Sequence, residues 1–140
     1  MKVNIGKERF GPWALITGAS SGIGREFARQ IAAAGINVVL VARRETTLIE
    51  VGRSIAKDFK VQHRVIAMDL SQEGFIPKLA ELTKDLDIGL VVSNAGTGNS
   101  GAQKSFRCCA QDVCRKRSIG HAGLSSLSRP SPTCCRHIAL

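Results

Sequence analysis

The segment Thr17-Gly18-Ala19-Ser20-Ser21-Gly22-Ile23-Gly24 constrains the fold more than any other part of the chain. Its three glycines follow an apolar run, residues 13–16, and open a segment with helical periodicity. Small residues let a backbone approach a pyrophosphate closely, and the first N–H groups of a helix point toward an anion. A glycine-rich surface loop is the alternative reading. The strand before and the helix after favour a phosphate-binding turn.

Apolar runs alternate with helical patterns as far as residue 98. Strands are expected at residues 13–17, 38–42, 62–68 and 88–93. Helices are expected at about residues 22–34, 45–59 and 74–86, the first with Ile23, Phe27, Ile31 and Ala34 on its apolar face. The run at 38–42 is continuously apolar, as in a parallel strand covered on both faces. The pattern predicts an α/β fold, a Rossmann-like three-layer structure with a parallel sheet of strand order 3-2-1-4.

This strand order opens a crevice at the carboxyl ends of the first and fourth strands, where such sheets bind ligands. The glycine turn leaves the first strand, and the small residues Ser93-Asn94-Ala95-Gly96 leave the fourth. Two such turns beside one crevice indicate a ligand site.

With these motifs the chain resembles the N-terminal, cofactor-binding part of the short-chain dehydrogenases/reductases over about residues 10–98. The family's turn Thr-Gly-x-x-x-Gly-x-Gly is matched by Thr17, Gly18, Gly22 and Gly24, with Ser20, Ser21 and Ile23 inside it. Its Asn-Ala-Gly after the fourth strand is matched by Asn94, Ala95 and Gly96, although the preceding Asn is Ser93 here.

The resemblance implies roles for residues on the adenosine side of the site. In the family, Asn-Ala-Gly supports the centre of the sheet and lines the adenosine pocket. Asp69-Leu70 resembles the pair after the third strand, whose acidic residue holds the adenine amino group. A solvated surface carboxylate is the alternative for Asp69.

Charge after the second strand predicts which cofactor binds. An acidic residue there hydrogen-bonds the ribose 2′-OH of NAD, whereas an arginine accommodates the 2′-phosphate of NADP. This chain has Arg43-Arg44, and guanidinium groups offer paired donors to phosphate. Two solvated arginines are the alternative, but the charge favours NADP.

Catalysis is not predicted for this chain. The family transfers hydride between NADP(H) and an alcohol or carbonyl substrate with a Tyr-x-x-x-Lys helix, a Ser and an Asn. The sequence contains no tyrosine, and no other residue supplies the required general acid or base in a recognisable arrangement. We therefore expect cofactor binding without catalysis and no small-molecule substrate. The sequence does not indicate which substrate would bind.

The resemblance also implies a sheet truncated after the fourth strand. Its residues Leu90, Val91 and Val92 would then form an apolar edge that invites self-association. We expect the isolated chain to be only marginally stable.

Residues 99–140 differ in composition from residues 1–98, which form the predicted dinucleotide-binding unit. They hold all 5 cysteines and 7 of the 20 Lys and Arg residues, but only 1 of the 11 Asp and Glu residues. No strand or helix period persists, so a basic, disordered tail is expected. The abrupt change suggests translation in a shifted frame or an altered exon.

The composition of this tail suggests two other functions. Zinc binding is disfavoured because the adjacent pairs Cys108-Cys109 and Cys134-Cys135 do not fit the usual ligand spacing. Interaction with nucleic acid or another partner through the basic tail, or through the sheet edge, is the alternative function, although the tail has no fold signature of a binding module.

No apolar run reaches the roughly 18 residues of a membrane span, and residues 1–10 lack a signal peptide's apolar stretch. A cytoplasmic location is expected.

Overall fold

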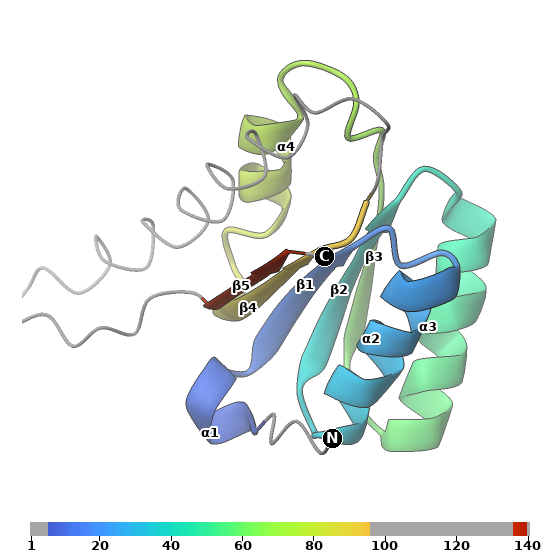
Figure 1. Cartoon of the computed structure of the whole chain (residues 1–140), viewed down its shortest axis with the longest axis vertical. Coiled ribbons are helices and arrows are strands. Elements are labelled where there is room, and N and C mark those ends of the chain that lie inside the picture. Colours follow the sequence, from blue (N-terminus) through green and yellow to red (C-terminus); the bar gives the residue numbers. More distant parts are fainter. Residues whose placement is uncertain (1–5, 96–135, 140) are drawn as a thin grey trace, which may run out of the picture.

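The computed structural model describes residues 6–95 and 136–139, which form a parallel sheet with helices on both faces (Figure 1). The sheet order is β3-β2-β1-β4-β5, and every neighbouring pair is parallel. In chain order the elements are α1 (Lys7–Phe10), β1 (Trp13–Thr17), α2 (Gly22–Ala33), β2 (Asn37–Ala42), α3 (Glu45–Phe59), β3 (His63–Ala67), α4 (Phe75–Leu82), β4 (Ile88–Ser93) and β5 (Arg136–Ala139). The predicted α/β fold and the order 3-2-1-4 are confirmed.

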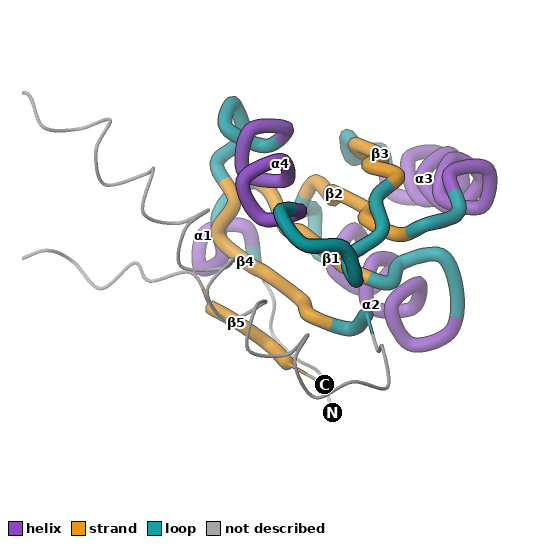
Figure 2. The backbone as a smooth tube through the Cα atoms, turned by 90° about the horizontal axis from the view of Figure 1, so that it is seen from above, coloured by secondary structure: helices purple, strands orange, loops and turns teal. Residues whose placement is uncertain are grey.

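The alternation of side chains along the central strands divides the core into two layers. On β2, Val38 and Leu40 pack toward α2 and α3, whereas Val39 and Val41 pack on the opposite face with α4. The two helical layers lie on opposite sides of the sheet (Figure 2). All four side chains are fully buried, which explains why the strand reads as a continuous apolar run.

The strands and α3 have the bounds that the sequence indicates to within a residue, but two helices differ in detail. In α2 Ile31 is buried and Phe27 packs against the core as expected, whereas Ile23 is 62% exposed and the other buried positions are Gly24, Ala28 and Ala32. Helix α4 ends at Leu82 instead of residue 86, where Thr83 leaves the helix and its hydroxyl donates to the Leu79 carbonyl.

The outer side of β4 differs from the expectation of an exposed edge. There β5 pairs with it in parallel, with Leu90 opposite Arg136 and Ser93 opposite Ala139. A four-residue strand so far along the chain carries no periodic signal, which is why the sequence did not indicate it. The hypotheses of a disordered tail, zinc binding and nucleic-acid binding concern mainly residues 99–135, which lie outside the described residues.

Within the described part of the chain, no helix is long and apolar enough to cross a membrane.

Candidate cofactor site

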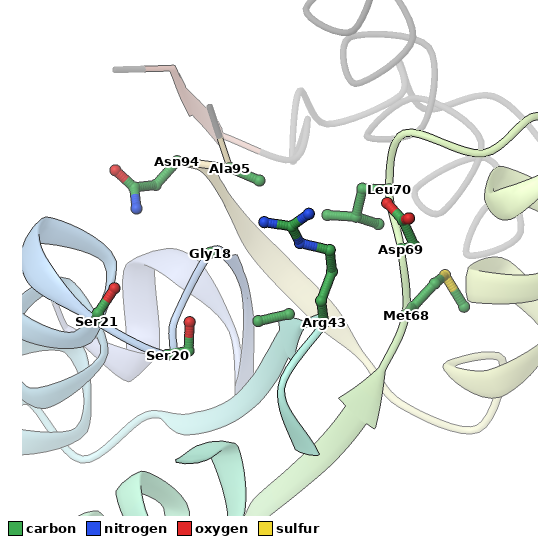
Figure 3. Close-up of a pocket in the computed structure, with 10 residues that line it drawn as sticks. Gly18, Ser20, Ser21, Arg43, Met68, Asp69, Leu70, Asn94 and Ala95 are labelled. Atoms are coloured by element: carbon green, nitrogen blue, oxygen red, sulfur yellow. The ribbon is translucent and has the colours of Figure 1, made fainter. Parts of the chain in front are cut away.

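A pocket of about 260 Å³ lies where β1, β2, β3 and β4 end (Figure 3). Its position matches the crevice expected from the strand order, at the carboxyl ends of the parallel strands. It is lined by Gly18, Ser20, Ser21, Ala42, Arg43, Met68, Asp69, Leu70, Asn94 and Ala95.

Close backbone packing forms the floor of the glycine turn. Gly18 has a φ of 68°, which disfavours other residues, and its N–H donates to the Val41 carbonyl at 2.8 Å. A Cβ on Gly24 would lie 2.4 Å from the Gly18 carbonyl oxygen and 2.5 Å from Nδ2 of Asn94. The first turn of α2 therefore packs directly against the turn and against Asn94, and only glycine fits there.

Thr17 joins the ends of β1 and β4. Its side chain is fully buried, and its Oγ1 accepts hydrogen bonds from the backbone N–H groups of Asn94, at 3.1 Å, and Ala95, at 3.2 Å. The same hydroxyl donates to the Val92 carbonyl at 3.4 Å. Thr17 thus lies beneath the pocket and fixes one of its walls.

The start of α2 presents donors to the pocket. Ser21 is the N-cap residue, its backbone is extended, and its side chain makes no capping hydrogen bond. Ser20 and Ser21 both line the pocket, and Ser21 is exposed. Free N–H groups and hydroxyls at the N-terminus of a twelve-residue helix provide the donor set that a diphosphate requires.

Arg43 and Asp69 bring opposite charges to the other side of the pocket. Arg43 follows the last residue of β2, and in Figure 3 its guanidinium lies between Asn94 and Ala95 on one side and Asp69 and Leu70 on the other. Two donors of Ser71, the hydroxyl at 2.6 Å and the backbone N–H at 3.0 Å, contact Oδ1 of Asp69. These bonds, and to a smaller extent the charge of Arg43, lower the pKa of Asp69.

The structure brings most of the predicted site residues together. Those that line the pocket are Gly18, Ser20, Ser21, Arg43, Asp69, Leu70, Asn94 and Ala95. Thr17, Gly22, Ile23, Gly24 and Arg44 do not line the pocket, and Gly96 lies outside the described residues.

Two lining residues were missed by the sequence reasoning. Ala42 is the last residue of β2, and Met68 follows β3 directly. Each immediately precedes a predicted site residue, Arg43 or Asp69. Their positions at strand ends on the ligand side were the only signal for them.

Comparison with known proteins assigns this arrangement to a family. Residues 12–118 match the short chain dehydrogenase family, so the match extends beyond the residues 10–98 that resemble it by motif. The chain belongs to the short-chain dehydrogenase family, a family of oxidoreductases that bind nicotinamide dinucleotides.

Among curated proteins, the chain is similar to a very-long-chain 3-oxoacyl-CoA reductase of Meyerozyma guilliermondii, with 45% identity over 92 residues, which is 64% of this chain and 27% of that protein. It is also similar to the human inactive hydroxysteroid dehydrogenase-like protein 1, with 37% identity over 91 residues, 64% of this chain and 27% of that protein. The chain therefore spans little more than a quarter of the length of these relatives.

Solved structures show the same fold. A 7beta-hydroxysteroid dehydrogenase matches with a TM-score of 0.71 and 28% identity, covering 84% of this chain and 51% of that one. The L-sorbose reductase of Gluconobacter frateurii, solved with NADPH and L-sorbose, matches with a TM-score of 0.65 and 29% identity, covering 84% and 49%. About half of each solved chain corresponds to this one.

Proposed function

We propose that the pocket binds the adenosine end of NADP(H) and that this chain by itself does not catalyse hydride transfer. The observation that carries the cofactor assignment is Arg43, which lines the pocket directly after β2. In sheets of this kind, the residue at that place meets the 2′ position of the cofactor ribose. A guanidinium there favours the 2′-phosphate of NADP over the 2′-OH of NAD.

The residues of the pocket fit the parts of the cofactor. The close packing of Gly18 and Gly24, where a Cβ would collide with backbone, leaves room for a diphosphate above the turn, next to Ser20 and Ser21. Asp69 accepts the Ser71 hydrogen bonds through Oδ1, which supports Oδ2 as the proposed acceptor of the adenine amino group. Bound NADPH supplies the hydride in this family's reactions.

Arg43, and not Arg44, is the proposed contact with the 2′-phosphate. Arg44 is the N-cap residue of α3, and its carbonyl accepts the Leu48 N–H at 3.2 Å. It does not line the pocket. The solved L-sorbose reductase and a Sphingobium yanoikuyae dehydrogenase contain NADPH, which agrees with a site of this kind in the fold.

The proposed lack of catalysis rests on the missing general acid. The chain has no tyrosine, the residue that protonates the substrate oxygen in the family. Lys and Ser residues are present in the chain, but among the described residues no lysine lines the pocket together with a serine.

Titration of the purified chain with NADPH and with NADH, followed by nucleotide fluorescence, tests the cofactor assignment. We expect NADPH to bind more tightly than NADH. Arg43→Asp should weaken NADPH by at least about tenfold and change NADH by less than about threefold, because one charge-assisted phosphate contact is lost. Arg44→Asp is the matched control and should cost less. Equal losses for the two variants would refute the assignment to Arg43.

Incubation with NADPH and a 3-oxoacyl thioester, the substrate class in the name of the Meyerozyma relative, tests the absence of catalysis. We expect no thioester-dependent loss of NADPH absorbance, with a complete family enzyme as the positive control. Turnover by this chain would overturn the proposal.

A cytoplasmic location is also proposed, and fractionation of cells that express the tagged chain would test it.

A further inference from the structure

The outer side of β4 holds a strand that comes from the far end of the chain. Residues Arg136–Ala139 pair with β4 in parallel over four consecutive positions, ending with Ala139 opposite Ser93. Figures 1 and 2 both show β5 beside β4. The pairing therefore reaches the last residue of β4, immediately before the pocket residues Asn94 and Ala95.

The end of β4 is connected to the pocket by hydrogen bonds and close packing. Ser93 is buried, and the next two residues donate their N–H groups to the buried Thr17 hydroxyl. Nδ2 of Asn94 lies so close to Gly18 and Gly24 that a Cβ on either glycine would approach it within 3.2 Å. A small shift of the end of β4 would therefore displace Asn94 and Ala95 relative to the glycine turn.

We propose that the outer edge of β4 is a docking site for a short parallel strand, which the chain fills with its own Arg136–Ala139, and that this docking positions Asn94 and Ala95 for dinucleotide binding. The effect on the cofactor rests on the proposed function, whereas the docking itself does not.

The chain's own segment is the occupant because it is tethered and in register. Without it, the outward N–H and C=O groups of β4 would lack strand partners. The entropy cost of bringing two segments together grows only slowly with their separation in sequence, so the distance along the chain between β4 and β5 does not prevent docking. A tether also raises the effective concentration of the segment over that of a free peptide. Because β5 pairs over four residues only, we expect the strand to undock and redock, and bound NADPH should stabilise its docking by reciprocity.

A double variant, His137→Pro with Ile138→Pro in the full chain, tests the docking. Successive N–H groups of a strand point to opposite sides, so this pair removes a donor to β4 whichever residue supplies it. His137→Ala with Ile138→Ala keeps both N–H groups and is the matched control. Should circular dichroism show the double proline chain to be unfolded, Ile138→Pro with Ala139→Pro, which also covers two successive positions and lies opposite Val92 and Ser93, replaces it.

Two measurements are made on each chain: amide hydrogen exchange in β4 and the Kd for NADPH. The proline variant should exchange faster at the β4 amides that face β5 and bind NADPH at least about fivefold more weakly, while the alanine control stays within about twofold. An unchanged exchange pattern would refute the docking. Faster exchange with an unchanged Kd would refute the coupling to the pocket.

A free peptide provides a further test, because a peptide with the sequence of β5 should dock on β4 even when it is not connected to the chain. A capped peptide of residues 136–140, added to the proline variant, should slow β4 exchange and restore NADPH affinity in a concentration-dependent way, and a peptide of the same composition in scrambled order should not. Equal effects of the two peptides would contradict the docking site. If the unmodified chain fails to bind NADPH, the proposed function fails, and the exchange data still decide whether β5 docks.

Discussion

The two walls of the cofactor pocket are built in different ways. The inner wall, formed by Gly18, Asn94 and Ala95 above Thr17 and Gly24, is held by buried hydrogen bonds and by contacts that admit no additional atom. The outer wall, formed by Arg43, Met68, Asp69 and Leu70, carries charged side chains at the ends of β2 and β3. Its Asp69 is held by hydrogen bonds from a residue two positions away.

This difference separates two properties of the site. Changes in the inner wall alter the packing of α2 against β1 and β4, so they should affect folding and binding together. Changes at Arg43 and Asp69 of the outer wall alter charges near the surface, so they should affect the choice of nucleotide with little effect on stability, whereas Met68 and Leu70 are buried and belong to the core. Variants that reverse this division would show that the comparison is wrong.

Gly24→Ala is expected to have the largest effect. The added methyl group would lie 2.4 Å from the Gly18 carbonyl oxygen, a backbone atom that cannot move away without shifting the turn. We expect a loss of about 1–3 kcal/mol in the free energy of unfolding, as in other overpacked sites, and a Kd for NADPH raised at least about tenfold. Urea unfolding and fluorescence titration measure the two effects.

Gly6→Ala is the control for that variant, because a Cβ at Gly6 meets nothing within 4 Å. It should leave both quantities near the values of the unmodified chain. Similar stability for the two alanine variants would mean that the turn and α2 are not packed as closely as the structure shows.

Thr17→Val is expected to come second. Valine keeps the shape of the buried side chain but removes the oxygen that accepts the N–H groups of Asn94 and Ala95. Leaving these donors without a partner should cost about 1–3 kcal/mol and weaken NADPH binding. Thr83→Val, at another buried threonine, removes only a donor to helix carbonyls and should cost less, about 0.5–1.5 kcal/mol. A larger loss at Thr83 would contradict the role assigned to Thr17.

Arg64→Met tests an exposed ion pair at the end of the sheet opposite the pocket. The Arg64 guanidinium donates to both carboxylate oxygens of Asp85, at 2.7 and 2.8 Å, and to the Leu82 carbonyl, and so connects β3 to the end of α4. We expect Tm to fall by only about 1–4 °C, and less at high salt, because exposed pairs are screened. The Kd for NADPH should not change.

The pH dependence of this pair has a definite sign. Hydrogen bonding to Arg64 lowers the pKa of Asp85 below its ordinary value of 3.8. Its contribution to stability is therefore complete above about that value and is lost as the pH falls through the lowered pKa. Scanning calorimetry of Arg64→Met and of the control Arg53→Met, on the exposed side of α3, should show a difference that becomes smaller in acid, where only the hydrogen bond to the Leu82 carbonyl remains. A difference of the same size at neutral and at the lowest pH would contradict this origin.

The sequence predicted the parts of the fold that depend on local patterns. The continuous apolar runs defined β1 and β4 to the residue, and the glycine spacing located the turn before α2. The patterns did not separate Arg43 from Arg44, because both residues follow β2 and only their arrangement in space shows that Arg43 lines the pocket and Arg44 does not. They also did not indicate β5, since four residues paired with a strand so far away leave no periodicity. Contacts between distant segments were the part that local patterns could not supply.

Ser71→Ala is expected to have the smallest effect and to act on the outer wall alone. The Ser71 hydroxyl is the main cause of the lowered pKa of Asp69, followed by the Ser71 N–H, which the variant keeps. The carboxyl carbon of Asp69, followed by NMR, should titrate below 3.8 in the unmodified chain and closer to 3.8 in Ser71→Ala, whereas Ser71→Thr should leave the midpoint unchanged. Because a lowered pKa contributes to stability above 3.8 and this contribution is lost as the pH falls through it, the loss of stability in Ser71→Ala should be present at neutral pH and vanish in acid, and it should be small because the Asp69 carboxylate lies near the surface. A large loss of stability at neutral pH in Ser71→Ala would show that the outer wall, like the inner one, supports the fold.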